Sequence, residues 1–337
     1  MHLTIMETIK IQGTSLEVSR VGLGTWAIGG WMWGGSNERE SIETIHTAIN
    51  SGITLIDTAP VYGFGRSEEI VGKALEGGLR ERVVIATKVG LDWNGDQPFR
   101  NASRARIFTE IDASLKRLHT DYIDIYQVHW PDPETPIEET AGAMLELFKQ
   151  GKIRAIGVSN FSSAQMERFR SVAPIHTLQP PYNLFERDIE KQILPYCLRN
   201  GISTVVYGSI CRGLLSGRMR IDTVFDGDDL RKTDPKFQGE RYAQYLQTVE
   251  RLDLFANEKF VKHVIELALR WVLDQSGVSV ALWAARRPEQ LAPISRAMGW
   301  SLSHEALRQI DRLLRESIFD PVGPEFMAPP SRERLAA

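Results

Sequence analysis

Strand-like and helix-like segments alternate along nearly the whole of this 337-residue chain, and this alternation limits its fold more than any other feature. Short apolar runs of strand length separate segments in which apolar residues recur at helical spacing. Eight strands are predicted, at residues 21–24, 54–56, 83–86, 122–128, 153–158, 176–179, 202–207 and 278–282. Eight such strand–helix units in a chain of this length favour a (β/α)8 TIM barrel, of the α/β class, over a doubly wound sheet.

Capping signals mark several of the predicted helix starts. Ser103 precedes a segment with apolar residues at helical spacing from 107 to 118, and its hydroxyl is expected to cap that helix. Residues 135–138, Thr-Pro-Ile-Glu, have the form of a capping box with proline at the first helical position. We therefore expect a helix after most strands, on the outside of the barrel.

Further segments are predicted before the first strand and before the last. Residues 7–19 have the pattern of a β-hairpin with Gly13 in its turn, which would close the bottom of the barrel. A polar loop, with aspartates at 226–229, and extra helices near residues 239–256 and 258–273 precede the eighth strand. We expect the aspartate-rich loop to be solvated.

The C-terminal part is predicted as one helix and a tail. The helix lies near residues 304–315, and the tail from Asp320, with four prolines, is expected to lie irregularly on the surface. We predict a single domain over residues 1–337, with the barrel at about 20–300 and the C-terminal helix and tail at 301–337.

Composition excludes several classes of partner. A net charge of −3 and a pI near 6.2 give no reason to expect nucleic acid or an anionic membrane. Cys197 and Cys211 stand apart from any Cys/His cluster, so we expect no metal site and a reducing compartment. No apolar run has the length of a membrane span, and the first residues lack the apolar stretch of a secretion signal. These features predict a cytoplasmic protein.

Polar side chains follow the predicted strands at the end where a barrel carries its active site. Asp57 follows the second strand, with Tyr62 in the loop behind it; Lys88 follows the third strand and His129 the fourth. A phenol is a weak acid near neutrality, with a pKa of about 10, and a neighbouring ammonium lowers that value. A carboxylate would hold the ammonium in place. This set suits protonation of a carbonyl oxygen while a hydride arrives from elsewhere.

Each of these residues also has a purely structural interpretation. Lys88 could be a solvated residue at a strand end, and Asp57 could cap a turn before Pro60. His129 could be an interior histidine with satisfied hydrogen bonds, and Tyr62 could be an aromatic wall residue. The position of all four at successive strand ends favours the functional interpretation over four separate accidents.

Four longer stretches resemble the aldo-keto reductase superfamily, over residues 21 to about 291. They are residues 52–63 (GITLIDTAPVYG), 85–88 (IATK), 127–132 (QVHWPD) and 151–161 (GKIRAIGVSNF). A narrower resemblance to bacterial family 11 enzymes of the general stress protein 69 type rests on residues 24–30, 179–183 and 320–327.

The resemblance implies reduction of small aldehydes and ketones to alcohols by a nicotinamide cofactor. It implies that Tyr62 is the general acid, that Lys88 lowers the pKa of Tyr62, and that Asp57 pairs with Lys88. His129 would orient the substrate carbonyl. We expect a small-molecule carbonyl substrate as the partner and a monomeric enzyme.

The resemblance also implies a cofactor site along the later strand ends. Nicotinamide would meet the polar side chains after strands five and six and stack on the tyrosine after strand seven. Residues 209–217 would follow the pyrophosphate, and the segment after strand eight would surround the adenosine and its 2′-phosphate. The expected contacts are Gly24, Thr25, Trp26, Ser159, Asn160, Gln179, Tyr207, Ser209, Arg212, Leu214, Arg286, Arg287 and Gln290.

Adjacent arginines at 286 and 287 favour NADPH over NADH, because a guanidinium matches a phosphate in bidentate fashion. The segment departs from the family pattern in Ala284 and Ala285, and in Pro293-Ile294 where a Glu-Asn pair is common. These departures concern the adenine end and leave the catalytic set untouched.

Tryptophans on the loops after strands are expected to form apolar walls of a substrate pocket. We assign Trp26, Trp33, Trp93 and Trp130 to that pocket.

Two other functions remain compatible with the sequence. The superfamily includes potassium-channel β-subunits, and the stretch at residues 129–132 also occurs there; such a redox-sensing subunit would bind NADPH and turn over slowly. A barrel aldolase would instead use Lys88 to form a Schiff base.

Overall fold

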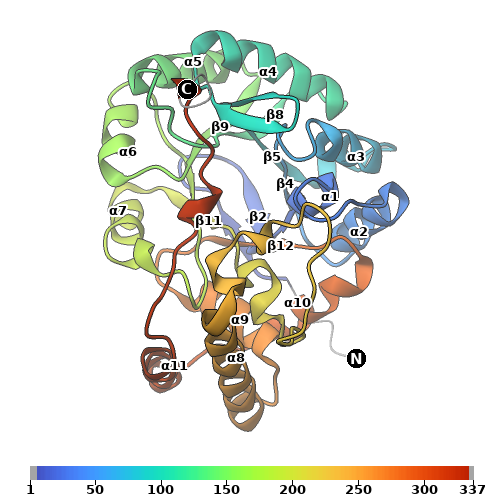
Figure 1. The fold of residues 1–337 in the computed structure, drawn as a ribbon. Helices are drawn as coiled ribbons and strands as arrows, with labels where there is room; N and C mark the ends of the chain where they lie inside the picture. Colours follow the sequence, from blue (N-terminus) through green and yellow to red (C-terminus); the bar gives the residue numbers. More distant parts are fainter. Residues whose placement is uncertain (1–5, 334–337) are drawn as a thin grey trace.

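The computed structural model describes residues 6–333, and residues 1–5, part of the segment searched for a secretion signal, lie outside them. Eight parallel strands close into a barrel, with helices around it (Figure 1). In order around the barrel the strands are β3 (Val21–Gly24), β4 (Leu55–Asp57), β5 (Val84–Val89), β8 (Ile123–Val128), β9 (Ile153–Ser159), β10 (Thr177–Gln179), β11 (Ser203–Val206) and β12 (Val280–Ala284). The predicted (β/α)8 barrel is confirmed.

Helices follow the barrel strands, with their apolar faces turned inward. They are α2 (Glu38–Asn50), α3 (Arg66–Ala74), α4 (Arg104–Arg117), α5 (Ile137–Lys149), α6 (Ser163–Arg170), α7 (Ile193–Asn200) and α9 (Val264–Asp274). In α4 the buried residues include Ile107 and Ile111, and the Ser103 hydroxyl accepts a hydrogen bond from the Arg106 N–H, as predicted.

The capping box predicted at residues 135–138 is wrong. Helix α5 begins at Ile137, and Pro136 occupies the cap position without a side-chain hydrogen bond to the helix. Thr135 instead donates its hydroxyl hydrogen to Asp132, at 2.7 Å. The carboxylate of Asp132 lies in the loop after β8 and is a stronger acceptor for this hydroxyl than any group at the helix start.

The bottom of the barrel is closed by the predicted hairpin. Strands β1 (Thr8–Lys10) and β2 (Glu17–Ser19) pair antiparallel, and Gly13 in the turn has φ of 72°. Ile11, Leu16 and Val18 pack against inward-facing residues of the barrel, so apolar side chains fill this end. The chemistry is thereby left to the opposite end.

Additional elements lie at the carboxyl ends of the barrel strands and in the C-terminal half of the chain. They are helices α1 (Trp26–Gly29), α8 (Gly239–Phe260), α10 (Ala292–Ala297) and α11 (His304–Ser317), and a hairpin of β6 (Leu91–Asn94) and β7 (Gln97–Arg100). The extra helices before the last strand and at the C-terminus are confirmed, whereas the β6–β7 hairpin was not predicted. Short 3₁₀ helices lie at Arg80–Arg82, Asp188–Glu190, Cys211–Ser216, Leu230–Lys232, Pro235–Phe237, Pro288–Leu291 and Glu325–Met327.

The tail is irregular and lies at the surface, as predicted, but its path was not predicted. After α11 the chain runs back across the mouth of the barrel (Figure 1). Backbone oxygens of Pro329 and Pro330 accept hydrogen bonds from Arg100, at 2.8 and 2.9 Å. Arg332 pairs with Asp132 and Glu134, at 3.1 and 2.9 Å. We call residues 320–333 the strap.

Within residues 6–333, no helix is both long and apolar enough to cross a membrane.

Candidate active site

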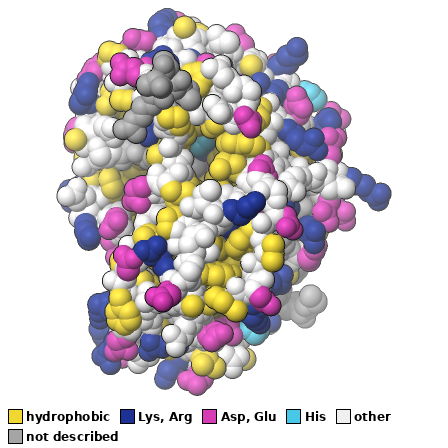
Figure 2. All heavy atoms as spheres, viewed as in Figure 1, with side chains coloured by type: hydrophobic (Ala, Val, Ile, Leu, Met, Phe, Trp, Pro, Cys, Tyr) yellow, Lys and Arg dark blue, Asp and Glu magenta, His cyan; other side chains and the backbone are white. Residues whose placement is uncertain are grey.

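A cavity of about 620 Å³ opens at the carboxyl ends of the barrel strands. Figure 2 shows hydrophobic side chains gathered on this face of the molecule. The lining comes from the ends of barrel strands, from the loop at 31–33, from residues 96–98 of the β6–β7 hairpin, from the segment 207–213, and from residues 326–330 of the strap. Segments far apart in sequence therefore share one cavity.

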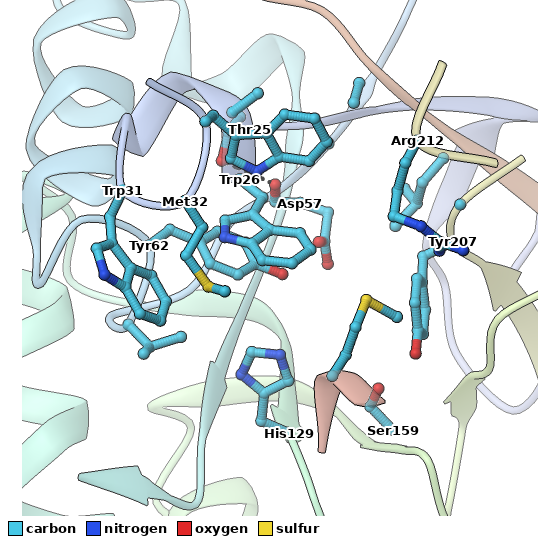
Figure 3. Close-up of a pocket in the computed structure, with 18 of the residues that line it drawn as sticks. Thr25, Trp26, Trp31, Met32, Asp57, Tyr62, His129, Ser159, Tyr207 and Arg212 are labelled. Atoms are coloured by element: carbon cyan, nitrogen blue, oxygen red, sulfur yellow. Dashed lines mark hydrogen bonds between the residues drawn. The ribbon is translucent and has the colours of Figure 1, made fainter. Parts of the chain in front are cut away.

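The predicted proton-transfer set meets at the base of this cavity. The Lys88 ammonium donates to Oδ2 of Asp57 at 2.6 Å, to the Thr58 carbonyl at 3.0 Å and to the Tyr62 hydroxyl at 3.3 Å. Lys88 is fully enclosed and Asp57 is 2% exposed. Parallel pairing of β3, β4 and β5 brings these strand ends side by side. Figure 3 shows Tyr62 and His129 turned toward the same space.

Burial controls the proton affinities of this set. It raises the pKa of Tyr62 well above the usual 10, and the negative charge of Asp57 raises it further. Burial lowers the pKa of Lys88, while Asp57 acts in the opposite direction. Tyr62 therefore holds its proton, because burial and the charge of Asp57 both raise its pKa.

His129 stands edge-on to Tyr62, with ring centroids 5.8 Å apart. Burial lowers its pKa well below 6.5, and the positive charge of Lys88 adds to that shift. The imidazole is thus neutral at physiological pH. A neutral imidazole can donate one hydrogen bond to a carbonyl oxygen without adding a second cation beside Lys88.

The residues predicted to bind nicotinamide also come together. Ser159 donates to the Gln179 carbonyl at 2.7 Å, and the Asn160 amide donates to the Ser159 hydroxyl at 3.0 Å. The Tyr207 hydroxyl donates to Asn160 Oδ1 at 2.9 Å. The Gln179 amide donates to Oδ1 of Asp57 at 2.7 Å, which joins this group to the proton-transfer set. Asn160 has φ of 61°, a left-handed conformation that asparagine tolerates.

The segment predicted to follow a pyrophosphate is only partly available for it. Ser209 lines the cavity, and its buried hydroxyl has no hydrogen-bond partner within residues 6–333. Arg212 also reaches the cavity, but its guanidinium already pairs with Glu186 and Asp234, each at 2.5 Å. Leu214 is fully buried in the core and is not part of the cavity lining.

Of the two arginines expected from the resemblance to surround the adenosine, one lines the cavity. Arg286 lines the cavity and donates to the carbonyls of Trp33 and Gly35, at 2.7 and 3.1 Å. Gln290 lines the cavity beside it and accepts from the Arg286 N–H at 2.7 Å. The Arg287 side chain is 58% exposed and lies outside the lining.

Aromatic side chains form much of the wall near Tyr62. Trp26 stacks on Tyr62 with centroids 5.9 Å apart, and Trp33 and Trp130 also line the cavity. Gly24 and Thr25 line it beside Trp26. Trp93, assigned to the pocket from sequence, lies elsewhere: it packs against Phe64 and beneath the guanidinium of Arg106.

Several lining residues were not predicted. Trp31 joins the wall, Arg231 reaches the cavity from the loop before α8, and Phe326 and Met327 reach it from the strap. The Asp226–Asp229 loop is not merely solvated either, since Asp228 accepts hydrogen bonds from the Met32 and Gly34 N–H groups. The sequence carries a turn signal for the β6–β7 hairpin, Asn94-Gly95, but no local signal for the path of the strap.

Within residues 6–333, no three His, Cys, Asp or Glu side chains are placed to hold a metal ion.

Known proteins match both the chain and its fold. The aldo/keto reductase family model matches residues 20–315. The chain is 60% identical over 331 residues to aldo-keto reductase YhdN of Bacillus subtilis (strain 168), covering 98% of this chain and 100% of that protein. It is 39% identical over 313 residues to the NADH-specific methylglyoxal reductase of Escherichia coli (strain K12), covering 88% and 95%.

A solved structure of similar fold is that of the glycerol dehydrogenase AKR11B4 from Gluconobacter oxydans. It aligns with a TM-score of 0.86 at 49% identity, covering 97% of this chain and 100% of that one. The predicted resemblance to family 11 enzymes is therefore confirmed. With a closed barrel, a strand-end cavity and matches over nearly its whole length, the chain belongs to the aldo/keto reductase family of oxidoreductases.

Proposed function

We propose that this protein is an NADPH-dependent reductase that converts small aldehydes and ketones to alcohols, with Tyr62 as the general acid. One observation carries the proposal: the Tyr62 hydroxyl lies at the base of the cavity, 3.3 Å from a Lys88 ammonium that is itself held by Asp57. A phenol in this position can give its proton to a carbonyl oxygen as negative charge develops there.

The lining of the cavity offers groups that suit a nicotinamide dinucleotide. Amide and hydroxyl groups of Ser159, Asn160 and Gln179 offer partners for a carboxamide, and the unpartnered Ser209 hydroxyl offers one for a phosphate oxygen. Tyr207 lies beside this group at the cavity wall. The cofactor, when bound, supplies the hydride that reduces the carbonyl carbon.

The protein's own groups then have separate tasks. Tyr62 carries the proton, and Lys88 stabilises the phenolate left after transfer. Asp57 fixes the Lys88 ammonium at 2.6 Å, so that the cation does not turn away from Tyr62. His129, neutral and beside Tyr62, orients the carbonyl oxygen through a hydrogen bond.

We propose NADPH in preference to NADH on charge grounds. Arg286 lies in the cavity with Arg231 near it, and the positive charges of Arg231 and Arg287 add to burial in lowering the pKa of Arg286. A site that concentrates positive charge in this way favours the additional phosphate of NADPH. The relative from Escherichia coli is NADH-specific by name, so the preference within this family has to be tested on this chain.

The substrate class follows from the cavity wall. The indoles of Trp26, Trp31, Trp33 and Trp130 and the strap residue Met327 make the wall largely apolar. Such a wall suits small carbonyl compounds with an apolar part and binds no charged group tightly. We propose small aldehydes and ketones without a net charge as substrates.

The test is steady-state oxidation of NADPH with a panel of such aldehydes. We expect Tyr62→Phe to lose activity by about 100-fold or more, since general acid catalysis contributes on the order of 10²–10⁴-fold. Tyr126→Phe is the matched control: Tyr126 is fully buried in β8, outside the cavity lining, and its hydroxyl has no partner within residues 6–333. Parental turnover by Tyr62→Phe would show that another group gives the proton.

A further inference from the structure

Both carboxylate oxygens of Asp57 are held by buried donors. Oδ2 accepts from the Lys88 ammonium at 2.6 Å. Oδ1 accepts from two side-chain amides, Gln179 at 2.7 Å and Gln127 at 3.3 Å. Gln127 is 1% exposed and comes from β8, two residues before His129. Gln127 opens the stretch QVHWPD at residues 127–132, but no role for its side chain was predicted from the sequence.

The barrel places Gln127 between the proton-transfer set and β9. In the parallel register Gln127 lies opposite Lys88 on β5 and opposite Gly157 on β9. A Cβ atom at Gly157 would lie only 2.7 Å from Cγ of Gln127, so the side chain occupies space that only glycine leaves free. Glycine at position 157 thus leaves the room that the Gln127 side chain occupies beside β9.

Chemistry fixes which end of the amide faces Asp57. An ionised carboxylate accepts hydrogen bonds and donates none, so only the NH₂ group of Gln127 can face it. The Oε1 atom is then left buried without a hydrogen-bond partner within residues 6–333. A buried polar atom without a partner is unfavourable, and such an atom in a folded protein calls for a functional explanation. Contact with Asp57 supplies that explanation.

We propose that Gln127 is a positioning residue for the reaction: its amide holds Oδ1 of Asp57, and Oδ2 is thereby kept facing Lys88 and, through it, Tyr62. The inference rests on the proposed reductase function. Gln179 also donates to Oδ1, but it lines the cavity where nicotinamide is proposed to bind. Gln127 does not line the cavity, so its hold on Asp57 is independent of what the cavity contains.

Loss of the Gln127 amide changes the charge that Tyr62 meets. Tyr62 faces Asp57 from β4, Lys88 from β5, and His129 and Tyr207 from the loops after β8 and β11. Of these groups Asp57 carries the negative charge that raises the pKa of Tyr62 in addition to burial. A carboxylate with one donor fewer is less neutralised and freer to rotate. Tyr62 then holds its proton more tightly, and Lys88 is held less well.

The direct test is Gln127→Met, which keeps the length of the side chain and removes both donors. We expect kcat for aldehyde reduction to fall by about tenfold, as for loss of one hydrogen bond to a charged group. The pH at which alcohol oxidation becomes half-maximal is expected to rise, because oxidation needs Tyr62 without its proton. Cofactor affinity, measured by fluorescence titration with NADPH, is expected to stay within about twofold of the parent, as befits a side chain outside the cavity.

Gln179→Met is the matched comparison, since it removes the other amide on Oδ1. It is expected to weaken NADPH binding as well as kcat, because Gln179 lines the cavity and Gln127 does not. Gln127→Glu provides a second variant of parental shape, so the test does not depend on one variant folding. Its new carboxyl can donate to Asp57 only while protonated, and kcat is expected to fall with rising pH as that proton is lost.

A double-mutant cycle shows whether Gln127 acts through Asp57. In an Asp57→Asn background, Gln127→Met is expected to have no further effect on kcat or on the pH profile. An equal loss in both backgrounds would overturn the inference. So would a Gln127→Met enzyme that unfolds at lower temperature but keeps the parental kcat and pH profile. Failure of the proposed function would appear differently, as absence of NADPH-dependent aldehyde reduction in the parent protein itself.

Discussion

The protonation of a single residue, His129, can be tested by measuring how the stability of the folded protein depends on pH. Its pKa in the folded protein lies well below 6.5, through burial and then through Lys88. As the pH falls below about 6.5, the unfolded chain therefore takes up a proton that the folded protein does not, and the folded state loses stability. The loss attributable to His129 should approach about 1.4 kcal/mol per pH unit within that window.

We predict that His129→Asn lessens this acid sensitivity. Urea unfolding midpoints of the parent and the variant, compared at several pH values between about 7 and 5, measure the difference. His176, whose pKa burial also lowers, remains in both proteins and keeps some acid sensitivity in the variant. Identical pH slopes for the two proteins would show that His129 titrates normally in the folded state.

At this scale the sequence predicted the residues whose places follow from topology. Asp57, Lys88 and His129 come directly after or at the end of strands, and parallel strands in a barrel end at one face. Predicting them needed only the strand pattern. Gln127 lies within a strand among apolar neighbours, where sequence alone does not show that its amide meets a carboxylate from a strand 70 residues earlier.

Arg212 illustrates the opposite case. Its sequence position, in the segment after β11, suggested a free cation for a phosphate. In the fold its charge is already met by Glu186 and Asp234, which lie 26 residues before and 22 residues after it. Burial alone would raise the pKa of Glu186, but Arg212 and Lys236 hold it below the usual range. Such pairing depends on loop paths, which spacing does not determine.

Among the elements, the barrel strands were predicted within a few residues, because their apolar runs are bounded by turns. The eighth strand shifted from 278–282 to Val280–Ala284. The β6–β7 hairpin was missed because, apart from the buried Leu91, its strand residues are half-buried or exposed and lack an apolar core pattern. The sequence pattern also predicts a helix near residues 187–199, where the structure has a 3₁₀ turn followed by the shorter α7. Helix ends depend on local packing, which the apolar pattern does not specify.

The loop after β12 carries the prediction on cofactor choice. Arg286 lies in the cavity, and the adjacent Arg287 has its side chain 58% exposed and outside the lining. We predict that Arg286→Met weakens NADPH binding by about tenfold or more, as for loss of a charge-assisted pair. NADH binding should change far less, because NADH lacks the additional phosphate.

Arg287→Met is the matched control for this loop, with the same change of charge one residue away. Fluorescence titrations of both variants and the parent with NADPH and NADH give the affinity of each variant for each cofactor relative to the parent. Arg286 also donates to the carbonyls of Trp33 and Gly35, which hold the loop that faces it. An equal loss of affinity for both cofactors in Arg286→Met would therefore assign Arg286 to loop support and not to recognition of a phosphate.

At the scale of the whole molecule, the strap joins the two ends of the cavity. On the side where the cofactor is proposed to bind (the cofactor side), the Lys236 ammonium donates to the Gly323 carbonyl at 3.1 Å, and Arg241 pairs with Asp320. On the side where the substrate is proposed to bind (the substrate side), Arg332 pairs with Asp132 and Glu134 in the loop after β8. The strap therefore completes a wall that the barrel leaves open.

The anchors at the two ends of the strap can be separated by mutation. We predict that Arg332→Glu, which places a carboxylate against Asp132 and Glu134, loosens the substrate-side end, where only the bonds from Arg100 to Pro329 and Pro330 then remain among the contacts described above. The contacts of Gly323 and Asp320 stay intact. The KM for aldehyde should rise roughly tenfold, since loss of one buried apolar wall contact costs on the order of 1.5 kcal/mol. NADPH affinity should change little, because the cofactor-side anchors remain.

The control for Arg332→Glu is Arg308→Glu, an identical change of charge on α11 at a side chain that is 68% exposed and pairs with Glu305 one turn earlier in the same helix. Steady-state kinetics of both variants, with NADPH saturating and aldehyde varied, give the comparison. A rise in KM for Arg332→Glu alone assigns the substrate wall to the strap. If both variants keep the parental KM, the barrel loops and their tryptophans form the walls that contact the substrate. The strap then covers the cavity without affecting which substrate binds.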